Sequence, residues 1–598
     1  MSNPEEFTEE QKQYLQGLVS GLDVARGRQV FVSTPNTGIG GPPTQAELTG
    51  PDAIHLRAQN RVLAEGKALT PEERAKRKKH PLDMWDELVQ HGTEGRYPKG
   101  TDVLAFKYHG LFYAAPAQDS YMCRLRLHGG ILRAEQLHQV ADIAQRFGGG
   151  YAHVTTRANL QIREIRAADA VAMLTQLHDA GIIPKGSGAD NIRNITGSPA
   201  AGIDPHELID TRALSSELHH YILNHREMYG LPRKFNIAFD GGGSIAVLED
   251  TNDIGFFAVR VGQGRAVPAA VYFRMALGGI TGHNDFARDT GVLLKPEQCV
   301  PVAAAVVRVF IEHGDRTDRQ KARLKYVLDR WGLDKYLEET QKLLPFALTR
   351  LPLEECEPRS PLRKHAHIGI HPQRQDGLYY IGVALPLGKL TTAQMHGLTE
   401  VSQRYGTGVL RLTVWQNLLV SDIREEHLPA VQQAIESMGL HWDSSEIRAG
   451  LIACTGNTGC LFAASDTKYH ATQIADHLEA RIKLDQPITI HLTGCPHSCA
   501  QHHISDIGLL GTKTQTENDE EIESYHVYVG GSYGSQQKVA REVYRGIAAT
   551  DVPRLLERML SAYLAHRTSA GETFNEFVAH HSSAVLHRLF EGEPVLTA

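Results

Sequence analysis

An internal duplication constrains the fold of this chain more than any other sequence feature. Residues 121–165 align without a gap with residues 379–423, at a constant offset of 258 positions, and 14 of the 45 aligned positions are identical. Each copy reads as an alternating strand, a glycine turn, a helix with one apolar face, a glycine break and a second strand. Because such a unit is too small to enclose a core, the two copies are predicted to pair in one domain with pseudo-twofold symmetry.

The resemblance between the two parts of the chain continues beyond these segments. Residues 195–200 in the first part occupy the place that residues 454–460 occupy in the second. The sequence therefore predicts two homologous halves, about 100–345 and 346–598, after an N-terminal extension. Only the first copy has Arg124 and Arg157, which Gly382 and Trp415 replace in the second, so the halves are predicted to have divided their functions.

Length and composition indicate a soluble multidomain enzyme. The 598 residues are expected to form roughly three to five domains, and 41% hydrophobic with 22% charged residues is ordinary for a globular protein. No apolar run reaches the roughly 18 residues of a membrane span, and the N-terminal residues lack the features of a secretory signal. We therefore expect a cytoplasmic protein with no membrane partner. The net charge of −7 is small for this length, so nucleic acid is not an expected partner.

Four of the seven cysteines are clustered. Cys123, Cys299 and Cys356 are scattered and are predicted to be small apolar residues of the core. The other four fall within 46 residues: Cys454, Cys460, Cys495 and Cys499. Four thiolates suit a [4Fe–4S] cluster or a tetrahedral zinc ion, but structural zinc sites usually use pairs spaced more closely than Cys-x5-Cys. The chain has no Cys-x-x-Cys, which argues against a thioredoxin-like site and against covalent c-type haem.

The residues around the second cysteine pair favour a cofactor over four unpaired core cysteines. Residues 488–493 read as a strand that Gly494 interrupts, and the glycine is predicted to let the backbone approach a bulky group. Backbone N–H groups in such a turn can donate hydrogen bonds to cluster sulfurs and tune the reduction potential.

The motif Cys-x5-Cys followed by Thr493-Gly-Cys-Pro-x-x-Cys499 resembles the signature of the sirohaem nitrite/sulfite reductases. The resemblance covers roughly residues 80–580, including the duplication. It implies two cofactors, sirohaem and a [4Fe–4S] cluster held by the four clustered cysteines. It also implies that Cys499 ligates both the cluster and the sirohaem iron, an arrangement that suits the passage of six successive electrons.

The resemblance and the duplication together predict an α+β (mixed α/β) fold. It would contain a pseudo-twofold duplicated ferredoxin-like domain plus two homologous α/β domains that bind sirohaem and the Fe–S cluster. The predicted domains are a partly helical N-terminal extension (1–100), the first ferredoxin-like half-domain (101–170), a sirohaem- and substrate-binding domain (171–345), the second half-domain (346–427) and a [4Fe–4S]- and sirohaem-binding domain (428–598).

An anionic cofactor and an anionic substrate require a concentration of positive charge, and the first half of the chain supplies it. Because side chains alternate along a strand, a strand from Tyr121 would place Arg124 and Arg126 on one face. Alternation would align further polar side chains in two other segments: Arg157, Asn159, Gln161 and Arg163 in 152–163, and Lys234 and Asn236 in 231–236. A single cation is usually a surface ion pair, but three such segments favour a basic cavity.

The resemblance assigns these residues to substrate and cofactor. The implied substrate residues are Arg124, Arg157, Lys234 and Asn236. The implied cofactor-binding residues, besides Cys499, are Arg126, Thr155, Asn159, Gln161, Arg163, Arg193 and Arg233. The forked donors of arginine fit carboxylates and oxyanions. Lys234 is the expected proton donor, because a buried lysine among cations has a depressed pKa.

One residue bears on the choice of substrate. Members of the family that reduce sulfite usually have Lys-x-Lys where this chain has Lys234-Phe-Asn236, and nitrite-reducing members have Lys-x-Asn. The expected activity is therefore the assimilatory six-electron reduction of nitrite to ammonium. The alternatives are a sulfite reductase with the same cofactors, an Fe–S oxygenase of corrinoid biosynthesis and a binding or sensing protein with a structural cluster.

Electrons are expected to come from another protein, because the sequence has neither a dinucleotide-binding fingerprint nor a Walker loop. The expected donor is ferredoxin or a separate flavoprotein reductase. The basic residues 74–79 are predicted to form a solvated helix face, or alternatively a landing patch for an acidic donor. The charged residues 312–325 are predicted to form a solvated helix, and residues 529–534 either a plain turn or a set of amides for haem carboxylates.

Overall fold

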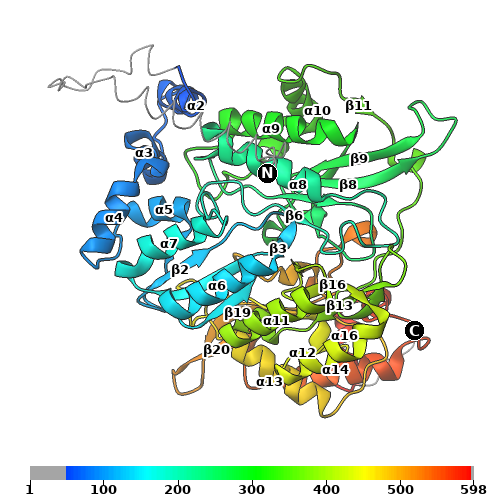
Figure 1. Ribbon diagram of the computed structural model, residues 1–598. Helices are drawn as coiled ribbons and strands as arrows, with labels where there is room; N and C mark the ends of the chain where they lie inside the picture. Colours follow the sequence, from blue (N-terminus) through cyan, green and yellow to red (C-terminus); the bar gives the residue numbers. More distant parts are fainter. Residues whose placement is uncertain (1–48, 594–598) are drawn as a thin grey trace, which may run out of the picture. The chain divides into compact units, whose positions relative to one another are not determined.

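The computed structural model describes residues 49–593, and its strands form four sheets (Figure 1). Two five-stranded sheets contain the duplicated segments. In spatial order the first is β1 (Leu111–Tyr113), β2 (Tyr121–Arg124), β5 (Leu160–Ile165), β4 (Tyr151–Val154) and β14 (Lys389–Thr391). The second is β12 (Gly369–Pro372), β13 (Leu378–Val383), β16 (Leu418–Arg424), β15 (Val409–Leu412) and β3 (Ile131–Arg133).

The two copies exchange an edge strand. Strand β3 of the first copy pairs with β15 in the second sheet, and β14 of the second copy pairs with β4 in the first. The following helices, α6 (Ala134–Phe147) and α11 (Thr392–Tyr405), pack against each other and lie side by side in Figure 1. These contacts confirm the prediction that the copies pair as one pseudo-twofold domain.

The segment 152–163 is a hairpin, and the prediction of one continuous strand is wrong. The Thr155 amide donates to the Asn159 carbonyl at 2.8 Å, and Ala158 adopts a left-handed conformation with φ of 45°. Arg157 and Asn159 therefore lie in a turn, where alternation does not apply. Alternation also fails elsewhere, because β2 ends at Arg124 and residues 231–236 precede β7 as a loop.

The other two sheets repeat one topology. One is β11 (Thr349–Arg350), β10 (Arg288–Leu294), β9 (Ala270–Leu277), β8 (Ile254–Val261), β7 (Ile237–Asp240) and β6 (Thr196–Gly197). The other is β17 (Leu451–Ala453), β18 (Ile490–Thr493), β19 (Ile507–Gln515), β20 (Glu521–Val529) and β21 (Arg541–Ala548). In each sheet the first three strands in chain order are parallel and the next two are antiparallel.

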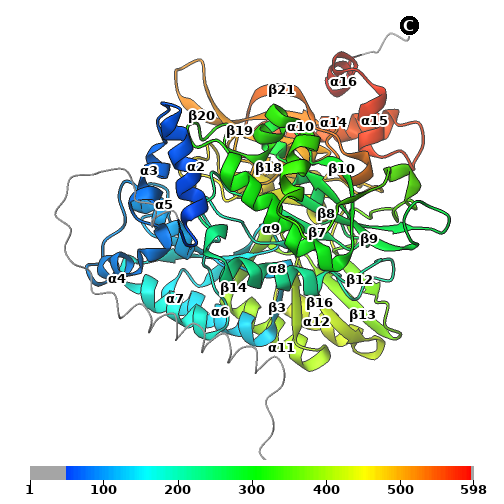
Figure 2. The same ribbon diagram turned by 90° about the horizontal axis from the view of Figure 1, so that it is seen from above.

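Equivalent helices accompany these two sheets. A crossover helix joins the first two parallel strands, α8 (Arg212–Asn224) in one sheet and α13 (Thr467–Glu479) in the other. A long helix follows the fifth strand, α9 (Pro296–His313) or α14 (Val552–His566). Figure 2 shows α8 and α9 next to strands β7–β10. The repeated topology agrees with the prediction of two homologous α/β domains.

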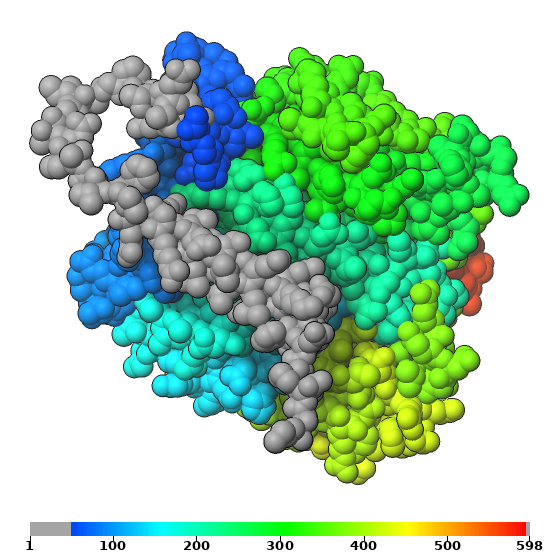
Figure 3. All heavy atoms as spheres, turned by 45° about the horizontal axis from the view of Figure 1, so that its top comes forward, coloured from blue at the N-terminus to red at the C-terminus, as the bar shows by residue number. Residues whose placement is uncertain are grey.

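The remaining helices flank these four sheets. They are α2 (Ala53–Ala64), α3 (Pro71–Lys78), α4 (Trp85–Thr93), α5 (Asp102–Phe106), α7 (Ala170–Asp179), α10 (Leu324–Gln341), α12 (Leu428–Ser437), α15 (Phe574–His580) and α16 (Ser583–Phe590). Residues 1–48 of the predicted N-terminal extension lie outside the described residues. The described part is helical, as predicted, and α2 packs on α9, so that blue residues border green ones in Figure 3. None of the described helices is long and apolar enough to cross a bilayer.

Two charged segments that were predicted to be solvated are partly buried. Helix α3 begins where predicted, with the Thr70 hydroxyl accepting from the Glu73 amide, but Lys76 is only 7% exposed. Residues 312–325 are not one helix, because α9 ends at His313 and α10 begins at Leu324. Arg316 and Arg323 between them are buried, since Glu73 and Asp253 compensate their charges. The prediction of a solvated helix is wrong for this segment.

Candidate active site

The two cysteine pairs leave neighbouring strands at the same sheet edge. Cys454 directly follows β17, and Cys495 and Cys499 lie in the turn that follows β18. Because β17 and β18 are parallel, their carboxyl ends meet. The Cys454 amide also donates to the Leu492 carbonyl at 3.0 Å, which fixes the first cysteine beside the second strand.

Backbone and side-chain groups near the cysteines donate to sulfur. The Gly494 amide lies 3.2 Å from the Cys454 sulfur, which agrees with the predicted N–H···S bonds. The structure gives a reason for Gly494 besides the predicted approach to a cofactor, which stays a prediction. A Cβ there would lie 2.7 Å from the Cβ of Ala463, so the glycine lets the Cys454–Cys460 loop pack on the β18 turn.

The spacing of the sulfurs suits an iron–sulfur cluster better than zinc. Zn–S bonds of 2.3 Å would place cysteine sulfurs about 3.8 Å apart. Among the described residues, however, no three of the cysteine sulfurs lie within 4.8 Å of one another. Burial, together with the other three clustered sulfurs, raises the pKa of Cys495 to about 12, so the thiolates require a compensating cationic group. The arrangement therefore fits a [4Fe–4S] cluster.

The clustered cysteines differ in exposure. Cys495 is buried and Cys454 and Cys460 are half-buried, whereas Cys499 is exposed. An exposed sulfur at the end of the cluster site can reach a second group, as the role of a shared ligand requires. Outside the cluster, Cys123 and Cys299 are buried core residues, as predicted, and burial raises the pKa of both thiols.

The β4–β5 hairpin of the first half contacts both cysteine segments of the second. The Thr156 hydroxyl donates to the Cys499 carbonyl at 2.9 Å. Arg163 donates to the Gly459 carbonyl at 3.2 Å and to the Thr455 hydroxyl at 3.0 Å. Arg163 also donates to Gln118 Oε1 at 3.1 Å, and its binding of haem carboxylates stays a prediction.

Several cations from the first half gather beside Cys499. The pKa of Lys234 is lowered to about 7 by burial and by three neighbouring arginines, against the opposing effect of the Cys499 sulfur. Burial lowers the pKa of Arg124, which the Cys499 sulfur partly restores. Arg193 lies close enough to Arg124 and Arg157 for their charges to lower its pKa further after burial. In the described part of the chain, none of these four cations forms an ion pair with a carboxylate.

Arg157 is held rigidly by neutral acceptors. Its guanidinium donates to the Asn194 carbonyl at 2.6 Å and to Asn252 Oδ1 at 2.9 Å. Burial is the main cause that lowers its pKa to about 9. Arg157 is half-buried and has no carboxylate partner among the described residues, a situation that favours an anion beside its guanidinium.

Unused donors extend this basic region. Arg126 Nη2, Arg163 Nε and Arg193 Nε are buried and have no hydrogen-bond acceptor in the described structure. Unpartnered guanidinium donors together with uncompensated cations fit a ligand that carries several carboxylates, such as sirohaem. The residues present therefore fit both implied cofactors.

The other predicted cofactor residues support the hairpin or lie beside it. Thr155 Oγ1 accepts from the Arg157 amide at 3.3 Å, and Asn159 Nδ2 donates to the Leu125 carbonyl. Gln161 lies opposite His153 in the β4–β5 register. Arg233 lies 3.8 Å from Asp190. Direct contacts of these four residues with a cofactor stay predictions.

Two buried aspartates of the site were missed in the sequence. Asp253 accepts from the Asn236 amide at 2.8 Å and from Arg323 at 2.7 Å. Asp190 is fully buried and accepts from Arg319 at 2.8 Å. Both carboxylates fix the backbone and cations around the Lys234 loop. The charged segment 312–325 could have indicated these aspartates, because its residues Arg319 and Arg323 need carboxylate partners.

The second copy has core residues where the first has cations. Trp415, at the position of Arg157, is 2% exposed and donates to the Ala246 carbonyl at 3.2 Å. Gly382, at the position of Arg124, lies so close to the neighbouring strand that a Cβ would be 2.2 Å from the His367 carbonyl. These contacts agree with the predicted division of function between the halves.

The glycine turn at 529–534 is a plain turn. The amides of Gly530 and Gly531 donate to the carbonyls of Asp506 and Ser505, and the Gly534 amide donates to Asp250 Oδ2 at 2.8 Å. Because protein acceptors use these amides, the alternative in which they bind haem carboxylates is wrong.

Comparison with known families gives two matches, and each model matches twice, as the duplication predicts. The model described as "Nitrite and sulphite reductase 4Fe-4S domain" matches residues 188–347 and 446–578. The model described as "Nitrite/Sulfite reductase ferredoxin-like half domain" matches residues 115–180 and 371–438.

Similar proteins cover most of the chain. A ferredoxin–nitrite reductase of Synechococcus elongatus is 33% identical over 82% of this chain and 95% of its own length. A chloroplastic ferredoxin–nitrite reductase of Zea mays is 32% identical over 84% of this chain and 92% of its own length. The solved structure of the Mycobacterium tuberculosis NirA protein aligns with a TM-score of 0.80 at 26% identity, covering 88% of this chain and 99% of that one.

Proposed function

Because the chain belongs to the nitrite and sulphite reductase family, we propose that it reduces nitrite to ammonium, with ferredoxin as the electron donor. The observation that carries the proposal is the meeting of the two halves at Cys499. The Thr156 hydroxyl contacts the carbonyl of this cysteine, and Lys234 and Arg124 lie within electrostatic reach of its sulfur. The names of the relatives, ferredoxin–nitrite reductases, support nitrite as the substrate.

The family cofactors, sirohaem and a [4Fe–4S] cluster, supply six electrons to the substrate when bound. The proposed cluster ligands are Cys454, Cys460, Cys495 and Cys499. Cys499, the exposed member, is the proposed shared ligand of the sirohaem iron. The unused donors of Arg126 and Arg193 are proposed to bind sirohaem carboxylates, with Arg233 beside them.

The remaining cations are proposed to bind the substrate anion. Among residues 49–593, Arg124 and Arg157 have no carboxylate partner, so their charge is available to an oxyanion. Arg157 is already fixed by Asn194 and Asn252, so it loses little conformational freedom when an anion binds. Lys234 is the proposed proton donor, because a lysine with a pKa of about 7 gives up its proton near neutral pH.

Asn236 is proposed to set the preference for nitrite over sulfite. An amide at this position leaves the site with less positive charge than a second lysine would, which suits a monoanion better than a dianion. The test is steady-state reduction of nitrite and of sulfite by the purified holoenzyme with reduced methyl viologen. We expect a higher kcat/KM for nitrite, and a higher value for sulfite would overturn the assignment.

The variant Asn236→Lys tests the residue itself. It is expected to shift the ratio of the two kcat/KM values toward sulfite by at least tenfold, about 1.4 kcal/mol. Asn224→Lys, at the end of α8, is a control that adds the same charge elsewhere in the domain. If Asn236→Lys keeps the wild-type ratio, Asn236 does not determine the substrate.

The sulfite reductase, the corrinoid oxygenase and the sensor remain the competing hypotheses. The full set of Arg124, Arg157 and Lys234 argues against the oxygenase. Sirohaem absorbance and iron content of the purified protein separate an enzyme of this family from a sensor with a structural cluster. A protein that contains iron and sulfide but no sirohaem would overturn the reductase proposal.

An exposed apolar patch beside the cluster supports a protein electron donor. Leu461 and Phe462, which directly follow Cys460, are 49% and 57% exposed, and Tyr469, in the first turn of α13, is 58% exposed. Phe462 also packs edge-on against His497, between the last two cysteines, with ring centroids 5.0 Å apart. Large exposed apolar side chains at one place are typical of an interaction surface. The patch therefore borders both cysteine segments and offers a short route for electrons.

A change in the patch separates docking from chemistry. Phe462→Ser is expected to lower kcat/KM with reduced ferredoxin severalfold and to leave the rate with methyl viologen unchanged. Leu343→Ser is the matched control, because Leu343 is similarly exposed and is distant in the sequence from the four clustered cysteines. An equal loss with both donors would contradict a docking role.

We also propose that the protein is located in the cytoplasm. The proposed domain division follows the predicted boundaries 101–170, 171–345, 346–427 and 428–598.

A further inference from the structure

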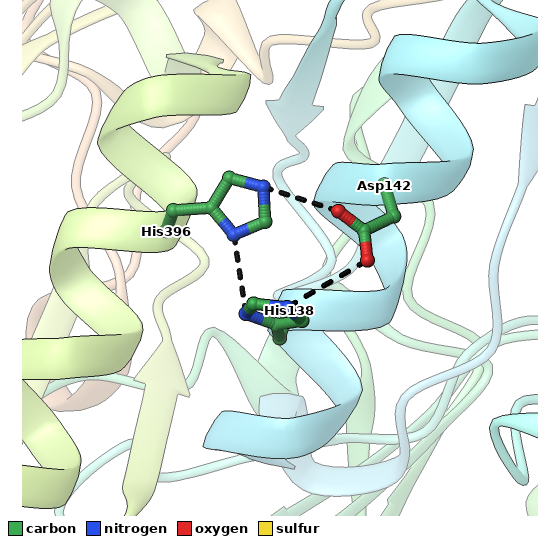
Figure 4. Close-up of side chains that lie close together, drawn as sticks. All are labelled: His138, Asp142 and His396. Carbon is green, nitrogen blue, oxygen red and sulfur yellow. Dashed lines mark hydrogen bonds and ion pairs between the residues drawn. The ribbon is translucent and has the colours of Figure 1, made fainter.

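A cluster of potential metal ligands lies outside the active site, on helices α6 and α11. Among the described residues, His138, Asp142 and His396 are the group of three whose ligand atoms all lie within 4.8 Å of one another (Figure 4). Their side chains are 50%, 54% and 30% exposed, so an ion from solution can reach them. The proposed function uses none of the three.

The cluster lies on the pseudo-twofold axis of the ferredoxin-like domain. His138 and His396 are equivalent residues of the two copies, 258 positions apart, and each is a close neighbour of the other. A residue that contacts its own symmetry equivalent must lie near the axis. Gln403, near the C-terminus of α11, contacts Glu135, near the N-terminus of α6, so the two helices run antiparallel.

The separations between the ligand atoms suit a small divalent ion. His396 Nδ1 lies 3.2 Å from His138 Nδ1, and His396 Nε2 lies 3.2 Å from Asp142 Oδ1. His138 Nε2 lies 3.6 Å from Asp142 Oδ2. Zinc bonds of 2.0–2.2 Å to nitrogen and oxygen place tetrahedral ligand atoms about 3.3 Å apart. These three distances use both ring nitrogens of each histidine, whereas an ion binds one atom of each residue. With one ligand atom per residue, the three atoms lie within 4.8 Å of one another, and rotation of the exposed side chains would have to close the remaining gap.

The duplication adds a second observation in favour of a ligand. Both copies carry a histidine followed four residues later by a carboxylate, His138 with Asp142 and His396 with Glu400. Residues four apart share one face of a helix. Glu400 is exposed at the position equivalent to Asp142 and supplies a fourth possible ligand. Because these positions are exposed, packing of the core does not explain why both copies keep the same pair.

We propose that His138, Asp142 and His396 bind a divalent transition-metal ion, with zinc as the best-suited ion. Imidazole and carboxylate ligands on two helices suit zinc, with water or Glu400 completing the tetrahedron. Such an ion joins the first copy to the second across the axis. It therefore stabilises the pairing of the two half-domains.

The test is equilibrium dialysis of the holoenzyme, first freed of loosely bound metal, against micromolar ZnCl₂. Zinc per chain is then measured by mass spectrometry. Wild type is expected to bind one more zinc ion than the double variant His138→Ala/His396→Ala. Asp142→Asn is expected to weaken zinc binding at least tenfold. His427→Ala, an exposed histidine beside a glutamate in the same domain, is the matched control and is expected to bind as much zinc as wild type.

A second readout tests the joining of the two copies. Zinc is expected to raise the thermal midpoint of wild type and of His427→Ala, but not that of the double variant, because only a bound ion adds stability. Equal zinc content in wild type and the double variant would overturn the proposal, as would an equal rise in all midpoints. Neither readout depends on nitrite reduction, so this test and that of the proposed function fail independently.

Discussion

The side-chain hydroxyl of Thr156 donates a hydrogen bond to the backbone carbonyl of Cys499, with 2.9 Å between the two oxygens. The two residues are 343 positions apart and belong to different halves of the chain. Thr156 precedes Arg157 in the β4–β5 turn, so this bond helps to set the distance between Arg157, a proposed substrate residue, and the last cysteine. Ser498, beside Cys499, has a φ of 52°, and the contact helps to hold this unfavourable backbone conformation.

Removing this hydroxyl is expected to loosen the site without dismantling it. One hydrogen bond contributes about 1 kcal/mol, so Thr156→Val is expected to lower kcat/KM for nitrite severalfold while iron and sirohaem contents stay unchanged. Thr156→Ser keeps the hydroxyl and is expected to retain most of the activity. Equal rates for the valine and serine variants would show that the bond does not matter for the reaction.

The assignment of the cluster ligands can be checked against a cysteine outside the cluster. Cys495→Ser is expected to lose most of its acid-labile sulfide and its activity, because an alcohol replaces one of four thiolate ligands. Cys356→Ser, in which a half-buried cysteine outside the cluster is changed, is expected to keep both. Sulfide and iron analysis of the two purified variants makes the comparison. A Cys495 variant with a full complement of sulfide would contradict the ligand set.

Much of the fold could be predicted from the sequence because the chain contains the same fold twice. The constant offset between residues 121–165 and 379–423 indicated two copies that pair, and the four clustered cysteines indicated the metal centre. The spacing of identical residues and of cysteines along the sequence was sufficient to predict the pairing of the copies and the position of the metal centre in the chain. The repeat does not show the exchange of β3 and β14 between sheets, since a short edge strand reads the same in either sheet.

The features that were missed depend on contacts between residues far apart in the sequence, or on a backbone conformation that is rare for the residue type. The turn between Thr155 and Asn159 contains neither Gly nor Pro, and Ala158 adopts a positive φ that its residue type does not indicate. Asp190 binds Arg319, 129 positions away, so no local pattern marks it as buried. The sequence indicated which cations to expect at the site, and their roles stay predictions, whereas their positions and their supporting carboxylates required the structure.

The pH dependence of the reaction tests Lys234 as the proton donor. Burial is the main cause that lowers its pKa to about 7, and the carboxylates of bound sirohaem are expected to raise this value. Because the protonated form is the donor, kcat/KM for nitrite is expected to fall as the pH rises through a value of about 7 or higher. The measurement is a profile of kcat/KM from pH 6 to 9 with methyl viologen.

Two variants at this position separate charge from proton transfer. Lys234→Gln is expected to lose about 10²–10⁴-fold in rate, the usual contribution of a general acid. Lys234→Arg keeps the positive charge but holds its proton more tightly, so KM is expected to change little while kcat falls and the alkaline limb disappears. An unchanged limb in Lys234→Arg would assign the titration to another group.

Asp190 is expected to stabilise the domain that carries the cations. Burial raises its pKa, but Lys76, Arg319 and Arg233 lower it more, to about 2. Since the unfolded value is about 3.9, this carboxylate contributes about 2–3 kcal/mol, which is fully present above pH 4 and is lost as the pH falls toward 2. Asp190→Asn removes the carboxylate that Lys76, Arg319 and Arg233 share, although Lys76 keeps Glu73 and Arg319 keeps Glu72, and is expected to cost about 3 kcal/mol at pH 7. Thermal scans should therefore show a midpoint several degrees below wild type at pH 7, a difference that shrinks below pH 4.

Asp334→Asn, which breaks the exposed pair with Arg350, is the control for Asp190→Asn and is expected to change the midpoint very little. Similar midpoints for the two variants would mean that Asp190 does not organise the site.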